Sequence, residues 1–96
     1  MKKLQKWLKD LNEDYTLEEL ENLEYLHLNF KNIDYLHKKI SKLKNLKKID
    51  LRSNNLKKFP KEIITLKNLE WLNLSNNKIK EIPQKITKLK NLEIIF

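Results

Sequence analysis

The sequence predicts an α/β solenoid, a right-handed superhelix of short repeats with a parallel sheet on its concave face and a helical cap at its N-terminus. Three observations predict this fold. An Asn-Leu pair recurs at a spacing of 23 residues, beginning at Asn22, Asn45, Asn68 and Asn91. Apolar and polar residues alternate just after each pair, as in a half-buried strand. A fixed period of this length indicates units that bury their apolar faces only against one another.

The first expected element is an amphipathic helix over residues 2–12. Leu4, Trp7, Leu8 and Leu11 follow helical spacing, and lysines occupy the opposite face. Asn12 to Asp14 should end this helix. A short basic helix with a Trp/Leu face could also lie on a membrane surface. We favour a cap, because the open core of a solenoid end needs a cover.

A second short helix should follow Thr16. Thr16 and Glu19 match the spacing of a capping box. Leu17 and Leu20 precede Ile40 and Leu43 by one 23-residue period. Residues 1–21 are therefore interpreted as the cap plus an incomplete repeat.

Three full repeats and the start of a fourth follow, at residues 22–44, 45–67, 68–90 and 91–96. Each should begin with a strand, at residues 25–28, 48–51 and 71–74, whose alternate side chains point inward. A second inward set spaced by four and then three residues predicts one or two helical turns on the return. Pro60 and Pro83 then fit the first helical position.

The run Leu46-x-x-Ile49-x-Leu51-x-x-Asn54-x-Leu56 and its copy beginning at Leu69 resemble the leucine-rich repeat. The period, with Phe59-Pro60 and Ile82-Pro83, is similar to the class found in Ras-group plant proteins and many bacterial cytoplasmic proteins. The resemblance covers residues 17–96. It implies that Asn54 and Asn77 are buried asparagines that bond the backbones of successive repeats. The first repeat departs from the pattern, because Lys31 and His37 replace Asn and Pro, so its turn should be irregular.

The asparagines that open the repeats have a different expected role. Each follows a helical segment, where Asn tolerates the left-handed conformation that ends a helix. The chain contains no glycine to take that position. We therefore expect Asn22, Asn45, Asn68 and Asn91 to be left-handed caps.

Outward strand residues should form columns across the concave face. One column is expected to contain Tyr25, Lys48, Trp71 and Ile94, and the next His27, Asp50, Asn73 and Phe96. A third is expected to contain Asn29, Arg52 and Ser75. The resemblance implies that a partner binds this face, and Trp, Tyr and Arg are common at interface hot spots. The expected function is a non-catalytic interaction module for a protein or peptide. Cation–π contacts of Lys48 could instead only stabilise the face. The expected binding residues are Tyr25, His27, Lys48, Asp50, Arg52, Trp71, Asn73 and Ser75.

Catalytic and cofactor chemistry find little support. His27 and Asp50 should be neighbours and could orient a general base, but no nucleophile is expected beside them. The chain has no Cys or Gly and two histidines, which disfavours disulfides, metal sites and phosphate loops. We expect no enzyme activity, no catalytic residue, no cofactor and no metal.

Charge supplies the alternative function, which is polyanion or nucleic-acid binding through a basic surface. The net charge is +8, and residues 25–96 carry 17 basic and 6 acidic residues. Most lysines map to the return side, so nucleic acid is the weaker interpretation. Without cysteine, an apolar signal or a membrane-length segment, we expect a cytoplasmic location without membrane association.

The C-terminal residues Ile94, Ile95 and Phe96 begin a fourth strand without a polar cap. Unpaired edge strands invite association. Two expectations follow, namely that the chain belongs to a longer array or that this edge mediates self-association into a homo-oligomer.

Overall fold

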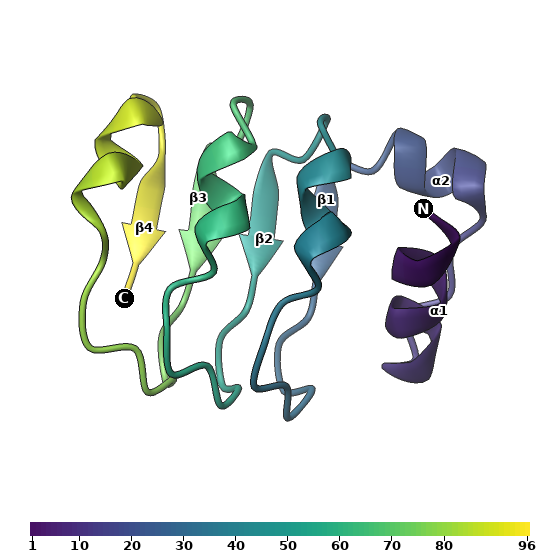
Figure 1. Cartoon of the computed structure of the whole chain (residues 1–96), viewed down its shortest axis with the longest axis horizontal. Coiled ribbons are helices and arrows are strands. Elements are labelled where there is room, and N and C mark those ends of the chain that lie inside the picture. Colours follow the sequence, from purple (N-terminus) through teal and green to yellow (C-terminus); the bar gives the residue numbers. More distant parts are fainter.

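Four parallel strands of three residues form one sheet in chain order (Figure 1). The computed structural model describes all 96 residues. Two N-terminal helices, α1 and α2, lie at one end of the sheet, and a short 3₁₀ helix follows each of the first three strands. The predicted solenoid is confirmed. The elements are α1 (Lys2–Asp10), α2 (Leu17–Glu21), β1 (Tyr25–His27), η1 (Lys38–Lys42), β2 (Lys48–Asp50), η2 (Lys61–Thr65), β3 (Trp71–Asn73), η3 (Gln84–Lys88) and β4 (Glu93–Ile95).

The core is a stack of leucine and isoleucine side chains between the sheet and the returns. Leu26, Ile49 and Leu72 are fully buried and aligned by the strand register. Burying one such side chain stabilises the fold by about 1.5–3 kcal/mol. The predicted return residues Ile40 and Ile63 are also fully buried. Repeats thus bury their apolar faces against one another.

The returns are tight 3₁₀ helices, and their prolines lie slightly earlier than predicted. Pro60 and Pro83 are the residues that precede η2 and η3, with φ of −72° and −66°. Their carbonyl oxygens accept the first helical hydrogen bonds, from Ile63 and Ile86. Proline's fixed φ suits this entry position as well as the first helical one.

The N-terminal helices cap the core as expected. Leu4 and Leu8 of α1 are fully buried. The capping box of α2 is present, because Thr16 Oγ1 accepts from the Glu19 N–H at 3.0 Å and Glu19 Oε1 accepts from the Thr16 N–H at 2.8 Å. Local hydrogen bonds and apolar docking therefore hold this end together.

An ion pair joins the cap to the first repeat. Lys31 Nζ lies 3.4 Å from Glu13 Oε2, and both side chains are mostly buried. Tyr15 donates its hydroxyl to Glu13 Oε1 at 3.3 Å. Burial, and then the charge of Glu13, raise the pKa of Tyr15 to about 12. Lys31 therefore serves as a link to the cap where later repeats carry an asparagine.

His37 lies at a second contact with the cap. The Trp7 ring of α1 packs against the rings of Tyr35 and His37, with centroid distances of 5.7 and 5.8 Å. His37 Nδ1 accepts a hydrogen bond from the Lys39 N–H at 3.0 Å and so caps η1. Burial, and then the nearby lysine charges and the N-terminal amine, lower the pKa of His37. A neutral histidine thus replaces the proline of later repeats.

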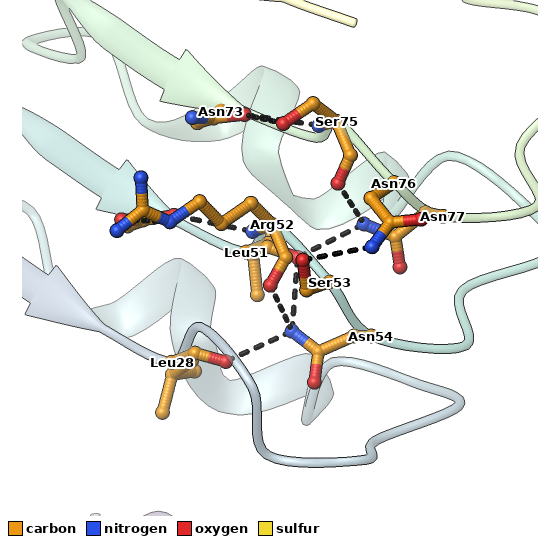
Figure 2. A network of polar contacts seen from close by, with 10 residues as sticks. Leu28, Leu51, Arg52, Ser53, Asn54, Asn73, Ser75, Asn76 and Asn77 are labelled. Carbon is orange, nitrogen blue, oxygen red and sulfur yellow. Dashed lines mark hydrogen bonds and ion pairs between the residues drawn. The ribbon is translucent and has the colours of Figure 1, made fainter.

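Asn54 and Asn77 bond successive repeats, as the sequence predicts (Figure 2). Asn54 is buried as expected, whereas Asn77 is only half-buried. Asn54 donates to the Leu28 and Leu51 carbonyls at 2.8 and 2.9 Å, and its oxygen accepts from the Lys31 and Ile33 N–H groups at 3.0 and 3.2 Å. Asn77 repeats the two donor bonds toward Leu51 and Leu74. Each amide thus satisfies backbone groups of two repeats that would otherwise be buried without partners.

The prediction for the asparagines that open each repeat was wrong. None of them has positive φ, and Asn22 has φ of −105°. The chain turns instead at Leu43, whose φ of −83° and ψ of 71° make an inverse γ-turn closed by Lys44 N–H to Lys42 O. This turn needs no left-handed residue. Asn45 and Asn68 instead donate side-chain hydrogen bonds to carbonyls of the preceding unit, at 2.7 and 3.1 Å.

The last strand pairs in a register shifted by one residue from the 23-residue period. Trp71 pairs with Glu93, and Leu72 pairs with Ile94. In earlier repeats one carbonyl accepts two consecutive N–H groups, as Lys47 O accepts from Glu70 and Trp71, whereas Glu70 O accepts only from Glu93. Because β4 begins one residue earlier in its repeat than β3 does, Ile94 lies beside Leu72 and not beside Trp71. The expected columns ending in Ile94 and Phe96 end in Glu93 and Ile95.

Candidate functional site

The outward face of the sheet brings most of the predicted binding residues together. The register aligns Tyr25, Lys48 and Trp71 in one row and His27, Asp50 and Asn73 in the next. Adjacent strands place such neighbours about 5 Å apart. The predicted adjacency of these residues is therefore confirmed, although their exposure differs among them.

An aromatic cluster occupies the first two strand positions. The Tyr25 and His27 rings stack with centroids 3.9 Å apart and an interplanar angle of 19°. The Trp71 ring meets Tyr25 edge to face at 6.4 Å. Tyr25 is 37% exposed and Trp71 is half-buried. Packed rings that still face solvent offer rigid contact area that loses little entropy on binding.

Asp50 is more buried than expected. It is 4% exposed, and its Oδ1 accepts from the Arg52 N–H at 3.1 Å. Its Oδ2 lies 3.5 Å from Arg52 Nε. A short side chain at an outward position has folded back onto the chain that follows the strand. Asp50 therefore positions the exposed guanidinium of Arg52 and is not itself open to a partner.

Asn73 repeats this arrangement one strand later. It is 6% exposed, and its Oδ1 accepts from the Ser75 N–H at 2.9 Å and from the Ser75 hydroxyl at 2.7 Å (Figure 2). Asp50 and Asn73 therefore lie at the predicted outward strand positions, but neither presents an open side chain. Ser75 is half-buried and turned toward Asn73.

The cations of the face are arranged differently from the prediction. Lys48 is exposed and takes part in none of the four ion pairs of the structure. Its expected cation–π contacts are not among the observed ones. The observed cation–π contact places Arg52 Cζ 6.0 Å from the ring centroid of Phe30.

Phe30 is a candidate residue that the sequence interpretation missed. Its side chain is 69% exposed, and its φ is +57°. Ser53 and Asn76 take the same left-handed conformation one and two repeats later, with φ of 57° and 54°. The turn thus imposes positive φ, which costs a bulky residue about 1–2 kcal/mol. The available signal was a large aromatic at a repeat position otherwise held by small polar residues.

The C-terminal edge is exposed in part. Ile95 is 38% exposed and Phe96 is 56% exposed, whereas Ile94 is half-buried by its inward register. Of the three predicted edge residues, Ile95 and Phe96 are therefore the more open.

His27 and Asp50 pair in the strand register, yet the His27 ring stacks on Tyr25 and Asp50 bonds Arg52. The structure has no group of three or more His, Cys, Asp or Glu residues that could hold a metal. It also has no helix long and apolar enough to cross a membrane. His27 and Asp50 thus contact other side chains of the face and not each other.

Comparison with known proteins places this geometry in context. A family model described as a leucine-rich repeat region matches residues 3–96. A solved structure of a leucine-rich repeat protein from Leptospira interrogans is 39% identical, with a TM-score of 0.71 over 84% of this chain. The match covers 21% of that chain, so this chain spans about a fifth of its length. No curated protein matches.

Proposed function

Because this chain belongs to the leucine-rich repeat family, we propose that it is a non-catalytic interaction module that binds a protein or peptide on the outward face of its sheet. The observation that carries the proposal is the aromatic cluster of Tyr25, His27 and Trp71. Large aromatic residues dominate the binding energy of interfaces. The stacking leaves these rings little freedom, so a partner orders few side chains on binding.

Charge on the face favours an acidic partner segment. Lys48 is exposed and forms no ion pair. Arg52 is half-exposed, and its Nε forms an ion pair with Asp50. The two terminal nitrogens of the Arg52 guanidinium can donate hydrogen bonds to both oxygens of a partner carboxylate. Asp50 and Asn73 act as supports that fix Arg52 and Ser75, and they need not touch the partner.

The size of the face favours a peptide. The sheet has four strands of three residues each, and the middle residue of each strand points inward, which leaves eight of the twelve strand positions on the outward face. A standard protein interface uses about 20–30 residues on each side. An extended acidic segment with an aromatic or aliphatic anchor fits the smaller area.

Site-specific photo-cross-linking tests this proposal. A photoreactive amino acid at Lys48 should capture a discrete partner from extracts of the source cells. The same amino acid at Lys67, an exposed residue of the return side, is the matched control. Capture from Lys48 alone supports the proposal, and equal capture from Lys67 contradicts it.

The place of action is proposed as the bacterial cytoplasm. The chain has no cysteine and so forms no disulfide, and disulfides are rare in reducing compartments such as the cytoplasm. Its solved relative is bacterial. Cell fractionation with an antibody checks this assignment, and recovery in the extracellular fraction contradicts it.

Self-association through Ile94, Ile95 and Phe96 is a separate part of the proposal. The outer edge of β4 presents unpaired backbone groups beside two exposed apolar side chains, and a second copy could pair with it.

A further inference from the structure

A basic hollow lies away from the sheet face, at the entry to η2 and η3. Its volume is about 430 Å³, within the range of roughly 300–1,000 Å³ typical of small-molecule sites. Phe59 and Pro83 line it together with four lysines and one glutamate. The charged lining residues are Lys57, Lys58, Lys61, Lys80 and Glu81.

The repeat geometry produces this clustering of charge. Lys57 and Lys80 occupy the same position in successive repeats, one 23-residue period apart. The Lys78 N–H donates to the Leu56 carbonyl at 2.8 Å, so the segments that carry these lysines run side by side. Like charges are thus held close together, which is unfavourable in the absence of a counter-charge.

No observed ion pair supplies that counter-charge to the lysines of the hollow. The four ion pairs of the structure involve Lys6, Lys31, Lys47 and Arg52, and none involves a lysine of the hollow. Glu81 is the one acidic residue in the lining. A neighbouring hollow shares Lys57, Lys58 and Lys61 but also contains Asp34 and Glu62. The excess of positive charge is therefore greatest on the side of Lys80.

The cations of the hollow suit a phosphate ligand. The single arginine, Arg52, lies on the sheet face, so the hollow has ammonium groups alone. Arginine and lysine both bind phosphate, arginine in a bidentate geometry and lysine as a point charge. Several lysines around one hollow can approach the oxygens of clustered phosphate groups from different directions.

We propose that this hollow is a binding site for an anion bearing clustered phosphate groups, separate from the sheet face. Such groups occur in free polyphosphate anions and in the headgroups of anionic lipids. Phe59 and Pro83 form the apolar floor, and Lys57, Lys61 and Lys80 supply most of the attraction. The site does not depend on the proposed function of the sheet face.

Calorimetric titration with inorganic tripolyphosphate tests the site at about 0.1 M salt, where exposed charges more than about 10 Å apart are largely screened. We expect saturable binding that weakens as salt rises, because exposed charges are screened. A triple variant, Lys57→Gln with Lys61→Gln and Lys80→Gln, should bind at least about tenfold more weakly, since three close charges are removed. All three side chains are exposed, so circular dichroism should be unchanged.

The matched control removes three lysines from another column. Lys44, Lys67 and Lys90 share one repeat position on the return side and are exposed. Substituting all three with Gln gives the same net charge and should weaken binding less than about threefold, because distant charges are screened. Equal losses in the two variants would show a general charge effect and overturn the site.

Vesicles of phosphatidylcholine with a phosphatidylinositol bisphosphate, whose headgroup carries several phosphate groups, separate the two sources. Binding of tripolyphosphate in solution assigns a free anion, and binding only to the vesicles assigns the lipid headgroup. Either result supports the site if the Lys57/Lys61/Lys80 variant loses it and the control retains it. No saturable binding to either probe overturns the proposal.

Discussion

The side-chain amide of Asn54 donates a 2.8 Å hydrogen bond to the carbonyl oxygen of Leu28, one repeat earlier in the chain. The same amide bonds Leu51 of its own repeat. One side chain, only 7% exposed, therefore joins two repeats. The chain has no glycine for its turns.

Replacing Asn54 with Ala should lower the free energy of unfolding by about 2–4 kcal/mol, because buried backbone groups of two repeats lose their partners. Urea denaturation followed by circular dichroism measures this loss. Asn68→Ala is the matched control, since its one bond, to the Lys44 carbonyl, is exposed, and it should cost less than about 1 kcal/mol. Similar losses in both variants would contradict the buried role of Asn54.

The register of β4 makes Ile94 the inward residue and Ile95 the more exposed one. Ile94→Asp should therefore destabilise the protein by about 1–3 kcal/mol more than Ile95→Asp, because a charge enters the apolar interior. Thermal and urea unfolding of both variants supply the comparison. The unshifted 23-residue period gives the opposite order, so a larger loss for Ile95→Asp would contradict the observed register.

Acid should weaken the cap through His37. Its pKa is lowered from 6.5 in the folded state, so the unfolded chain binds the extra proton first as pH falls below 6.5. Stability is therefore full above that pH and declines as pH falls toward the folded pKa. Protonation of Nδ1 also removes the acceptor for the Lys39 N–H. Unfolding free energies measured between about pH 7 and 5 should show this decline.

His37→Asn should flatten that dependence, because an asparagine oxygen can cap η1 without titrating. His27→Asn removes the other histidine, which is exposed on the sheet face, and should leave the decline in place. A decline that persists in His37→Asn would assign the effect to other groups.

The C-terminal edge should associate through its exposed apolar residues. Sedimentation velocity over a concentration series should show dimers whose population rises with concentration. Phe96→Glu should shift the protein toward monomer, because edge charges oppose strand pairing. Phe30→Glu, which changes a 69% exposed aromatic in the first repeat, should not. A purely monomeric wild-type protein at high concentration would contradict self-association.

Much of the fold followed from the period, because every repeat must bury the same positions. Leu26, Ile49 and Asn54 were predictable on that ground, and the capping box at Thr16 was predictable from local spacing. The shifted register at Glu93 was not predictable. It depends on the loss of a second backbone hydrogen bond to the Glu70 carbonyl, while the 23-residue spacing of the sequence is unchanged.

The candidate site was predictable in its residues but not in their exposure. Alternation correctly placed Asp50 and Asn73 on the outward side of the strands, but it cannot show that a short polar side chain folds back onto its own backbone. The exposure of Phe30 was not predictable, because it results from a left-handed backbone conformation that a phenylalanine disfavours. Such features depend on backbone geometry and not on periodicity.

The most direct test of sheet-face binding uses the partner segment that is cross-linked by the photoreactive amino acid at Lys48. The affinity of this segment is measured for two purified double variants. Trp71→Ala with Arg52→Ala should weaken binding by at least about thirtyfold, since a hot-spot residue contributes about 2 kcal/mol or more. Lys67→Ala with Lys90→Ala, on the return side, should change the affinity less than about threefold. Circular dichroism should be the same for both variants. An unchanged affinity after loss of Trp71 and Arg52 would contradict binding on this face.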